Sequence, residues 1–280
     1  MSSVSRVDAH IHFWDPARTP QPWMTEAEAA INRAFGPSDL EPLLVRNGVD
    51  SVILVQGANL DSDTDDLLEA ARSNPWIGAV TAWLCLEEPA RAARRLDELA
   101  DQPKVRAIRH LIHNEPEHWI MRPAVLESIA LLEQRDITLE APVVFPNHFD
   151  DIGELAERFP RLRLVIDHLG KPPTGTPEMA RWEQQLRRVA EHPNVLAKVS
   201  GLNTTISRSW TSDDFRAGLE VALEAFGPDR LMCGSDWPVA LLNGTYDTVW
   251  QAHCELAKSV AGEHADALLG GNACRIYQVS

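Results

Sequence analysis

The sequence predicts a single-domain (β/α)8 barrel that spans residues 1–280, and three features support this prediction. Short apolar runs alternate with longer amphipathic stretches along the whole chain. The starts of successive apolar runs lie 26 to 44 residues apart, which leaves room for a helix and two turns in each interval. No GxGxxG turn follows any predicted strand, which disfavours an open dinucleotide-binding sheet. An α/β barrel of this length commonly forms one domain.

The predicted strands are short and rich in β-branched residues, as buried parallel strands tend to be. Runs such as SVILVQG and RLVIDH have this character. The predicted strands cover residues 7–13, 51–57, 77–84, 105–112, 137–143, 163–168, 196–201 and 231–236.

Helix signals fill the intervals between the strands. Residues 38–41 (SDLE) have the pattern of a capping box, and Gly48 is placed to end the helix that follows. Residues 90–100, 124–135 and 215–227 carry apolar side chains at helical spacing. The first strand-to-helix connection, between Trp14 and Ser38, is long and contains Trp23. Long loops in compact domains tend to be functional, and this one would lie on the carboxyl face of the barrel.

Composition excludes several classes of function. Lysine plus arginine number 26 against 41 aspartate plus glutamate, and the resulting net charge of −15 disfavours nucleic acid as a partner. No stretch approaches the uninterrupted apolar length of a membrane span, and the first residues lack the apolar core of a secretory signal. We therefore expect no membrane partner and a cytoplasmic location. The four cysteines form no CxxC pair, and the sequence carries no indication of oligomeric state.

Two histidine motifs end predicted strands. His10 and His12 lie two residues apart, so both side chains point to one face, where they could bind a divalent cation or polarise a carbonyl group. The alternative is that they only fill a polar layer of the barrel. His168 ends the sixth strand and would face the same mouth, although a core histidine bonded to a carbonyl group has the same pattern. Lys171 follows it and either binds substrate oxygens or is solvated.

Charged residues end three further strands. Asp236 ends the eighth strand, where nearby histidines suit it to general-base catalysis; its alternative role is a helix cap. Arg109 and His110 end the fourth strand as candidate substrate-binding residues, and their alternation places only one of them at the mouth. Lys198, in the seventh strand, either reaches the pocket or pairs with a carboxylate.

Three of the nine tryptophans lie at or near strand ends, namely Trp14, Trp83 and Trp237. Aromatic faces at such positions could stack on the C–H side of a sugar ring or exclude water. Packing in the core is the alternative for each of them.

Taken in order, several motifs resemble those of the amidohydrolase-related sugar-lactonase family, whose members include L-fuconolactonases, L-rhamnonolactonases and 2-pyrone-4,6-dicarboxylate lactonase. The resemblance runs from about residue 6 to residue 277. Its motifs are VDAHIHFWDP, KVRAIRHLIH, VIDHLGKPP, AKVSGL, FGPDRLMCGSDWPV and the closing GGNACRIY.

The resemblance implies a barrel that hydrolyses a lactone with His10, His12, His168 and Asp236 as catalytic residues. The sequence departs from the wider superfamily at two places. The fourth strand ends without a lysine that could be carbamylated, and the fifth strand has Glu140 where many metal-binding relatives have histidine. A binuclear centre is therefore not expected. A single Zn²⁺ held by His10, His12 and Asp236, with Glu140 or His168, is one possibility, and metal-free activity, as in some family members, is the other.

The mechanism we expect is attack of water on the lactone carbonyl, with Asp236 as the base that later protonates the ring oxygen. Because Arg109 is the only strand-end arginine near the mouth, a neutral sugar lactone such as L-fuconolactone or L-rhamnonolactone is favoured over a pyrone dicarboxylate. A barrel decarboxylase, an amide hydrolase and a non-catalytic ligand-binding barrel are the competing hypotheses.

Overall fold

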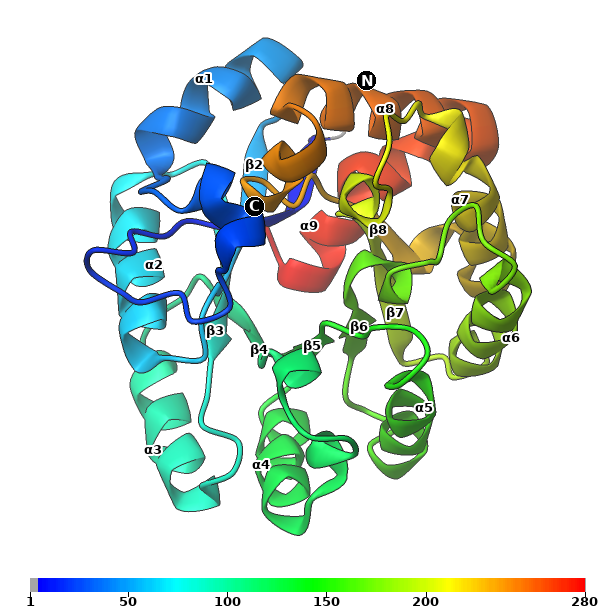
Figure 1. The fold of residues 1–280 in the computed structure, drawn as a ribbon. Helices are drawn as coiled ribbons and strands as arrows, with labels where there is room; N and C mark the ends of the chain where they lie inside the picture. Colours follow the sequence, from blue (N-terminus) through cyan, green and yellow to red (C-terminus); the bar gives the residue numbers. More distant parts are fainter. Residues whose placement is uncertain (1–4, 280) are drawn as a thin grey trace.

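A computed structural model describes residues 5–279, and its eight parallel strands form one sheet in sequence order. Helices surround this sheet and follow the strands in alternation (Figure 1). This architecture confirms the predicted (β/α)8 barrel. The strands are β1 Val7–Ile11, β2 Ser51–Val55, β3 Ile77–Trp83, β4 Val105–Arg109, β5 Thr138–Ala141, β6 Leu164–Ile166, β7 Val195–Val199 and β8 Leu231–Cys233.

The ring is completed just beyond β8, where the chain pairs with β1. The His12 N–H donates to the Trp237 carbonyl at 2.7 Å, and the Asp236 N–H donates to the His10 carbonyl at 2.8 Å. These bonds place the segment after β8 directly beside the histidine pair. Strands β1, β6 and β8 end two or three residues earlier than predicted, so His10 lies within β1, whereas His12, His168 and Asp236 lie in the turns that follow the strands.

The long helices are α1 Pro37–Asn47, α2 Asp61–Ser73, α3 Pro89–Leu99, α4 Pro123–Gln134, α5 Phe149–Arg158, α6 Met179–Ala190, α7 Asp213–Phe226 and α8 Tyr246–Leu256, followed by the shorter α9 Asn272–Tyr277. The predicted helices at 90–100, 124–135 and 215–227 correspond to α3, α4 and α7 within two residues at each end. Shorter helical turns punctuate the loops, among them η1 Glu26–Ile31 and η4 Asp167–Gly170.

The predicted capping box at the start of α1 is wrong by two residues. The cap is Gly36, whose N–H donates to the Asp39 carboxylate at 3.1 Å, and Pro37 occupies the first helical position. Proline is favoured there because its missing N–H would have no intrahelical partner. The predicted stop is confirmed, since Gly48 adopts the left-handed conformation (φ 63°) that ends many helices.

Two apolar layers hold the barrel together. Outward-facing strand residues pack against the helices, and a smaller cluster fills the barrel interior. The interior cluster contains side chains of β1, β2 and β8 together with Ile276 and Tyr277 of α9. Helix α9 therefore packs against the barrel interior and lies at the centre of the ring in Figure 1.

The long loop after β1 is tied to the barrel at both ends. Trp14 and Phe35 exchange two backbone hydrogen bonds, of 3.1 and 2.8 Å. Within the loop, the Trp23 Nε1–H donates to the Gly57 carbonyl at 2.8 Å. These bonds fold the loop over the mouth of the barrel, on the face where it was predicted.

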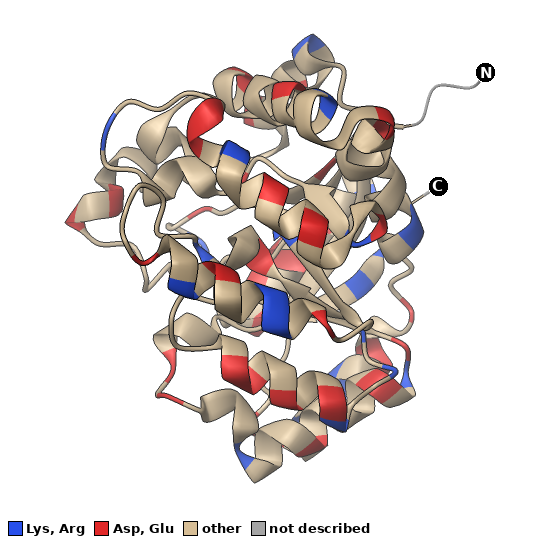
Figure 2. Cartoon of the chain, turned by 90° about the vertical axis from the view of Figure 1, so that its right-hand side faces the viewer, with Lys and Arg blue, Asp and Glu red and all other residues tan. Residues whose placement is uncertain are grey.

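Acidic and basic residues intermingle on the outer helices (Figure 2). Arg187, for example, pairs with both Glu183 and Glu224 on the outer surface. Within residues 5–279, no helix has both the length and the apolar character needed to cross a membrane.

Candidate active site

A cavity of about 100 Å³ opens at the carboxyl ends of the strands. Its lining combines ionisable groups with aromatic and apolar side chains, a composition typical of small-molecule sites. The lining residues are His12, Trp14, Trp23, Gly57, Arg109, Leu111, His113, Pro142, His168, Lys171, Asp236 and Val239.

His10 and His12 are brought together as predicted, although simple alternation does not explain how. Val7 and Ala9 face the barrel interior, so a regular strand would point His10 outward. The pairing of β1 with β2 shifts register between Asp8 and Ile11, and this irregularity turns His10 inward. Its Nε2 lies 3.1 Å from the His12 Nε2. His12 lines the cavity, whereas His10 lies behind it and is fully buried.

Asp236 faces both histidines from the turn after β8. Its Oδ1 lies 3.3 Å from the His12 Nε2 and 3.7 Å from the His10 Nε2. The residue has a left-handed backbone (φ 61°), a conformation in which aspartate is enriched. Burial raises the pKa of its carboxyl group, but the facing His168 and the nearby imidazoles of His12 and His10 outweigh burial and hold the pKa below its ordinary value. Asp236 is therefore ionised at neutral pH.

His168 reaches the same cavity because the chain turns sharply after β6. His168, Leu169, Gly170 and Lys171 all have positive φ values. The His168 Nδ1 lies 2.9 Å from the Ser200 Oγ. Burial lowers the pKa of His168 to about 4, so its imidazole is neutral at physiological pH.

Gly201 permits the close approach of His168 and Asp236. A Cβ atom at residue 201 would lie 2.6 Å from the Asp236 Oδ2 and 2.8 Å from the His168 Nδ1. Gly201 also has φ of +60°, a conformation that side chains rarely adopt. Glycine is therefore required at this position.

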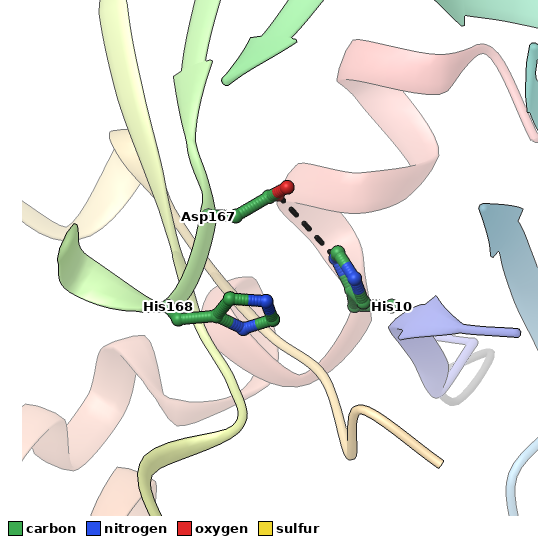
Figure 3. Close-up of side chains that lie close together, drawn as sticks. All are labelled: His10, Asp167 and His168. Atoms are coloured by element: carbon green, nitrogen blue, oxygen red, sulfur yellow. Dashed lines mark ion pairs between the residues drawn. The ribbon is translucent and has the colours of Figure 1, made fainter. Parts of the chain in front are cut away.

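Asp167 is a site residue without a predicted role, although it lies within the motif VIDHLGKPP. Its Oδ2 accepts a hydrogen bond from the Arg109 Nε at 2.7 Å, and its Oδ1 lies 3.4 Å from the His10 Nδ1. Figure 3 shows this carboxylate and the His168 ring both facing His10, with a dashed line that joins Asp167 to His10. Burial alone would raise the pKa of Asp167, but His10, Arg109 and Lys198 lower it well below its usual range. The signal in the sequence was its position beside His168 at the end of a strand.

The structure corrects the expectation that Glu140 is a metal ligand. Its Oε1 accepts hydrogen bonds from Thr81 at 2.7 Å and from Tyr277 at 2.6 Å. Its Oε2 pairs with the Lys198 Nζ at 2.7 Å. Glu140 thus lies deeper in the barrel as the partner of a buried lysine. Of the two roles considered for Lys198, pairing with a carboxylate is correct.

Three expected substrate-binding residues lie outside the cavity lining, which corrects that expectation for Trp83, His110 and Trp237. The Trp83 Nε1–H donates to the His110 Nδ1 at 3.1 Å, and the His110 ring stacks on Trp119 with centroids 4.2 Å apart. Trp237 is 1% exposed and packs edge-on against Phe35. As predicted, only one residue of the pair Arg109 and His110 reaches the mouth, and it is Arg109.

The other aromatic and basic side chains of the wall are two predicted residues, Trp14 and Lys171, and two that received no role, Trp23 and His113. The His113 Nδ1 is buried and has no hydrogen-bond partner within residues 5–279. Burial lowers the pKa of His113 to about 3, so it is a neutral imidazole facing the cavity. As a neutral ring, His113 is suited to bind a substrate hydroxyl and does not add positive charge to the cavity.

The cluster of His10, His12 and Asp236 fits one divalent cation. The three donor atoms are 3.1 to 3.7 Å apart. Ligands of tetrahedral Zn²⁺ are separated by roughly 3.3 Å, given Zn–N bonds of about 2.0–2.1 Å. The buried Asp167 Oδ1 lies behind the His10 Nδ1 without a hydrogen-bond partner in the described residues, where it could accept the proton of a metal-bound imidazole. A second possible ligand group consists of His10, Asp167 and His168, and it shares His10 with the first.

Comparison with known proteins gives consistent matches over nearly the whole chain. The profile of the amidohydrolase family matches residues 7–279. An L-fucono-1,5-lactonase from Burkholderia ambifaria is 36% identical over 279 residues, which cover 98% of this chain and 96% of that protein. An L-fucono-1,5-lactonase from Burkholderia multivorans is 33% identical and is covered to 95%.

Among solved structures, an amidohydrolase from Burkholderia multivorans with bound zinc superposes on this chain with a TM-score of 0.91. The two proteins are 33% identical, and the match covers 99% of this chain and 100% of the other.

Proposed function

Because this chain belongs to the amidohydrolase family, we propose that it is a lactonase that hydrolyses a sugar lactone to the aldonic acid. The likeness to two L-fucono-1,5-lactonases supports this class of substrate. The observation that carries the proposal is the meeting of His12, His168 and Asp236, from three distant parts of the chain, on one wall of the cavity.

Asp236 is the proposed base. It is ionised at neutral pH and faces the cavity, so it can take a proton from the water that attacks the lactone carbonyl carbon. Attack forms the carbon–oxygen bond of a tetrahedral oxyanion. When this intermediate collapses, the bond to the ring oxygen breaks and Asp236 returns its proton to that oxygen. The product is an aldonic acid, which releases one proton to solvent at neutral pH.

His168 is the proposed donor to the oxyanion. In this proposal the Ser200 hydroxyl, 2.9 Å away, donates its proton to the His168 Nδ1, so that the neutral ring carries its own proton on Nε2. An N–H aimed at the developing negative charge stabilises it more in this buried site than it would in water. The His12 ring is fixed by the Val55 carbonyl, which lies 2.8 Å from its Nδ1, and it forms the wall of the cavity beside Asp236.

A divalent cation, with Zn²⁺ as the leading candidate, would be held by His10, His12 and Asp236 and would supply Lewis-acid polarisation of the carbonyl. The roles of His168 and Asp236 in binding and proton transfer hold with or without it.

The cavity wall favours a neutral substrate. Arg109 lines the cavity, but its Nε is engaged by Asp167 and its Nη1 donates to the Gln56 carbonyl at 3.0 Å. Among the described residues, Lys171 is then the one remaining lining cation, and one cation is too few to bind a dicarboxylate. Trp14 and Trp23 offer aromatic surface to the C–H face of a sugar ring, and His113 and Lys171 offer groups that bind hydroxyls.

A panel of lactones tests the proposal. Purified protein is mixed with L-fucono-1,5-lactone, L-rhamnonolactone, other aldonolactones and a pyrone dicarboxylate, and acid release is followed with a pH indicator. We expect turnover on the aldonolactones, most of all on the 6-deoxy sugars. Activity on the dicarboxylate alone, or release of CO₂ in place of acid, would refute the proposal.

A further inference from the structure

Lys198 is a buried cation that contacts His10, on the side of the site away from the cavity. Its side chain is fully buried between strands, and its Nζ lies 2.7 Å from the Glu140 Oε2 and 3.3 Å from the His10 Nδ1. An ammonium group has only donors, so the ring nitrogen that faces it must accept. This contact requires a lone pair on the His10 Nδ1.

Asp167 faces the same nitrogen but, as an acceptor, favours the opposite protonation of it. Its Oδ1 lies 3.4 Å from the His10 Nδ1 and would need that nitrogen to carry a proton. This oxygen has no hydrogen-bond partner within residues 5–279, so the His10 contact lacks the alignment of a hydrogen bond. Lys198 and Asp167 therefore favour different tautomers of His10, and the geometry favours the one that accepts from Lys198.

That tautomer completes a directional chain of hydrogen bonds. With Nδ1 accepting from Lys198, neutral His10 carries its proton on Nε2 and donates it to the His12 Nε2 at 3.1 Å. His12 in turn donates from Nδ1 to the Val55 carbonyl at 2.8 Å. Each N–H in this chain faces an acceptor, so protein groups alone set the direction of the hydrogen bonds through the histidine pair.

We propose that Lys198 is a positioning residue that keeps the His10 proton on Nε2 and thereby weakens the binding of a divalent cation to His10, His12 and Asp236. A cation at these three residues needs the lone pair of the His10 Nε2, which this tautomer does not offer. The tautomer suited to a cation would turn an N–H of His10 toward the ammonium of Lys198.

The fold holds Lys198 in place from the far side of the barrel. Glu140 balances its charge, and the Tyr277 hydroxyl of α9 donates to that carboxylate at 2.6 Å. The Lys198 Nζ also lies 5.3 Å from the centre of the Tyr277 ring. The carboxyl-terminal helix thus fixes a lysine whose other contact is a histidine of the site.

The first test measures the tautomer directly. Protein labelled with ¹⁵N-histidine and freed of metal by dialysis against chelator is examined by ¹H–¹⁵N NMR, with His10 assigned from a His10→Gln variant. We expect the wild-type His10 to carry its proton on Nε2. Lys198→Met should move it to Nδ1, facing Asp167. The double variant Lys198→Met with Glu140→Gln removes both buried charges and keeps the side-chain volumes similar. It replaces the single variant in this test if the single variant does not fold.

The second test measures zinc affinity by competition with a chromophoric chelator. Second-shell changes alter metal affinity by about 10–100-fold, so we expect the Zn²⁺ dissociation constant to fall at least about tenfold in the Lys198 variants. Lys104→Met is the matched control and should leave the constant unchanged, since the bonds of Lys104 in the part of the chain that the structure describes are to the Ala71 and Asn74 carbonyls.

An unchanged His10 tautomer, or an unchanged zinc affinity, in the folded Lys198 variants would overturn the proposal. Neither readout involves turnover, so failure here is distinct from failure of the proposed lactonase activity.

Discussion

Replacing Asp236 by asparagine isolates the proton transfer on which the proposed reaction depends. The amide has the shape of the carboxyl group and keeps an oxygen that can occupy the Oδ1 position, 3.3 Å from the His12 Nε2. Asparagine is also enriched in the left-handed conformation that residue 236 adopts at φ 61°. We therefore expect Asp236→Asn to fold normally and to bind substrate.

The loss expected in kcat follows from the role of the group. A positioned general base contributes about 10²–10⁴-fold, equivalent to about 3–5 kcal/mol of transition-state stabilisation. Among the lining residues that the structure describes, Asp236 is the one carboxylate, so none of the others can replace it as an anionic base. The loss should therefore fall in that range and appear in kcat, with KM changed little.

The assay is the initial rate of acid release from L-fucono-1,5-lactone, with binding measured by calorimetry and folding by thermal denaturation. Asp150→Asn, on the exposed surface of α5, is the matched control and should behave as wild type. A kcat for Asp236→Asn within tenfold of wild type, in folded protein, would refute the assignment of the base.

Three further predictions concern the support of the site. Gly201→Ala should lower kcat by about 10²-fold in the same assay, because the added methyl displaces Asp236 by a distance that costs about this much in rate. Arg109→Met should lower the free energy of unfolding by about 3–5 kcal/mol in urea titrations, because Asp167 is left buried without its partner; a loss below 1 kcal/mol would contradict this. Burial lowers the pKa of His253 to about 4 from an ordinary value of 6.5, so the unfolded chain binds its proton first as pH falls. The free energy of unfolding should therefore decline between about pH 6.5 and pH 4, by up to about 3 kcal/mol from this group. Urea titrations at several pH values measure this decline, which should be shallower in His253→Gln.

Much of the site was predictable because a parallel barrel brings the carboxyl ends of all its strands to one face. His10, His12, His168 and Asp236 each follow a short apolar run, and position at a strand end was sufficient to group them. Loop residues such as Trp23 and His113 were not assigned, because no periodicity specifies where a loop side chain points.

The errors have physical causes of a different kind. Glu140 lies on a strand that faces the barrel interior, but its depth depends on Lys198 and Tyr277, which are distant in sequence. Trp83 and His110 satisfy each other by a hydrogen bond and so turn away from the cavity. The inward turn of His10 depends on an irregular strand pairing that alternation does not reveal.

The central claim is that one lactone carbonyl sits between Asp236 and His168. A crystal structure of Asp236→Asn with L-fucono-1,5-lactone tests it most directly. The intact lactone should lie in the cavity, with its carbonyl oxygen toward the His168 Nε2 and its carbonyl carbon about 3–3.5 Å from a water held by residue 236. A lactone bound with its carbonyl toward Trp14 and Trp23, or outside the cavity, would contradict the account.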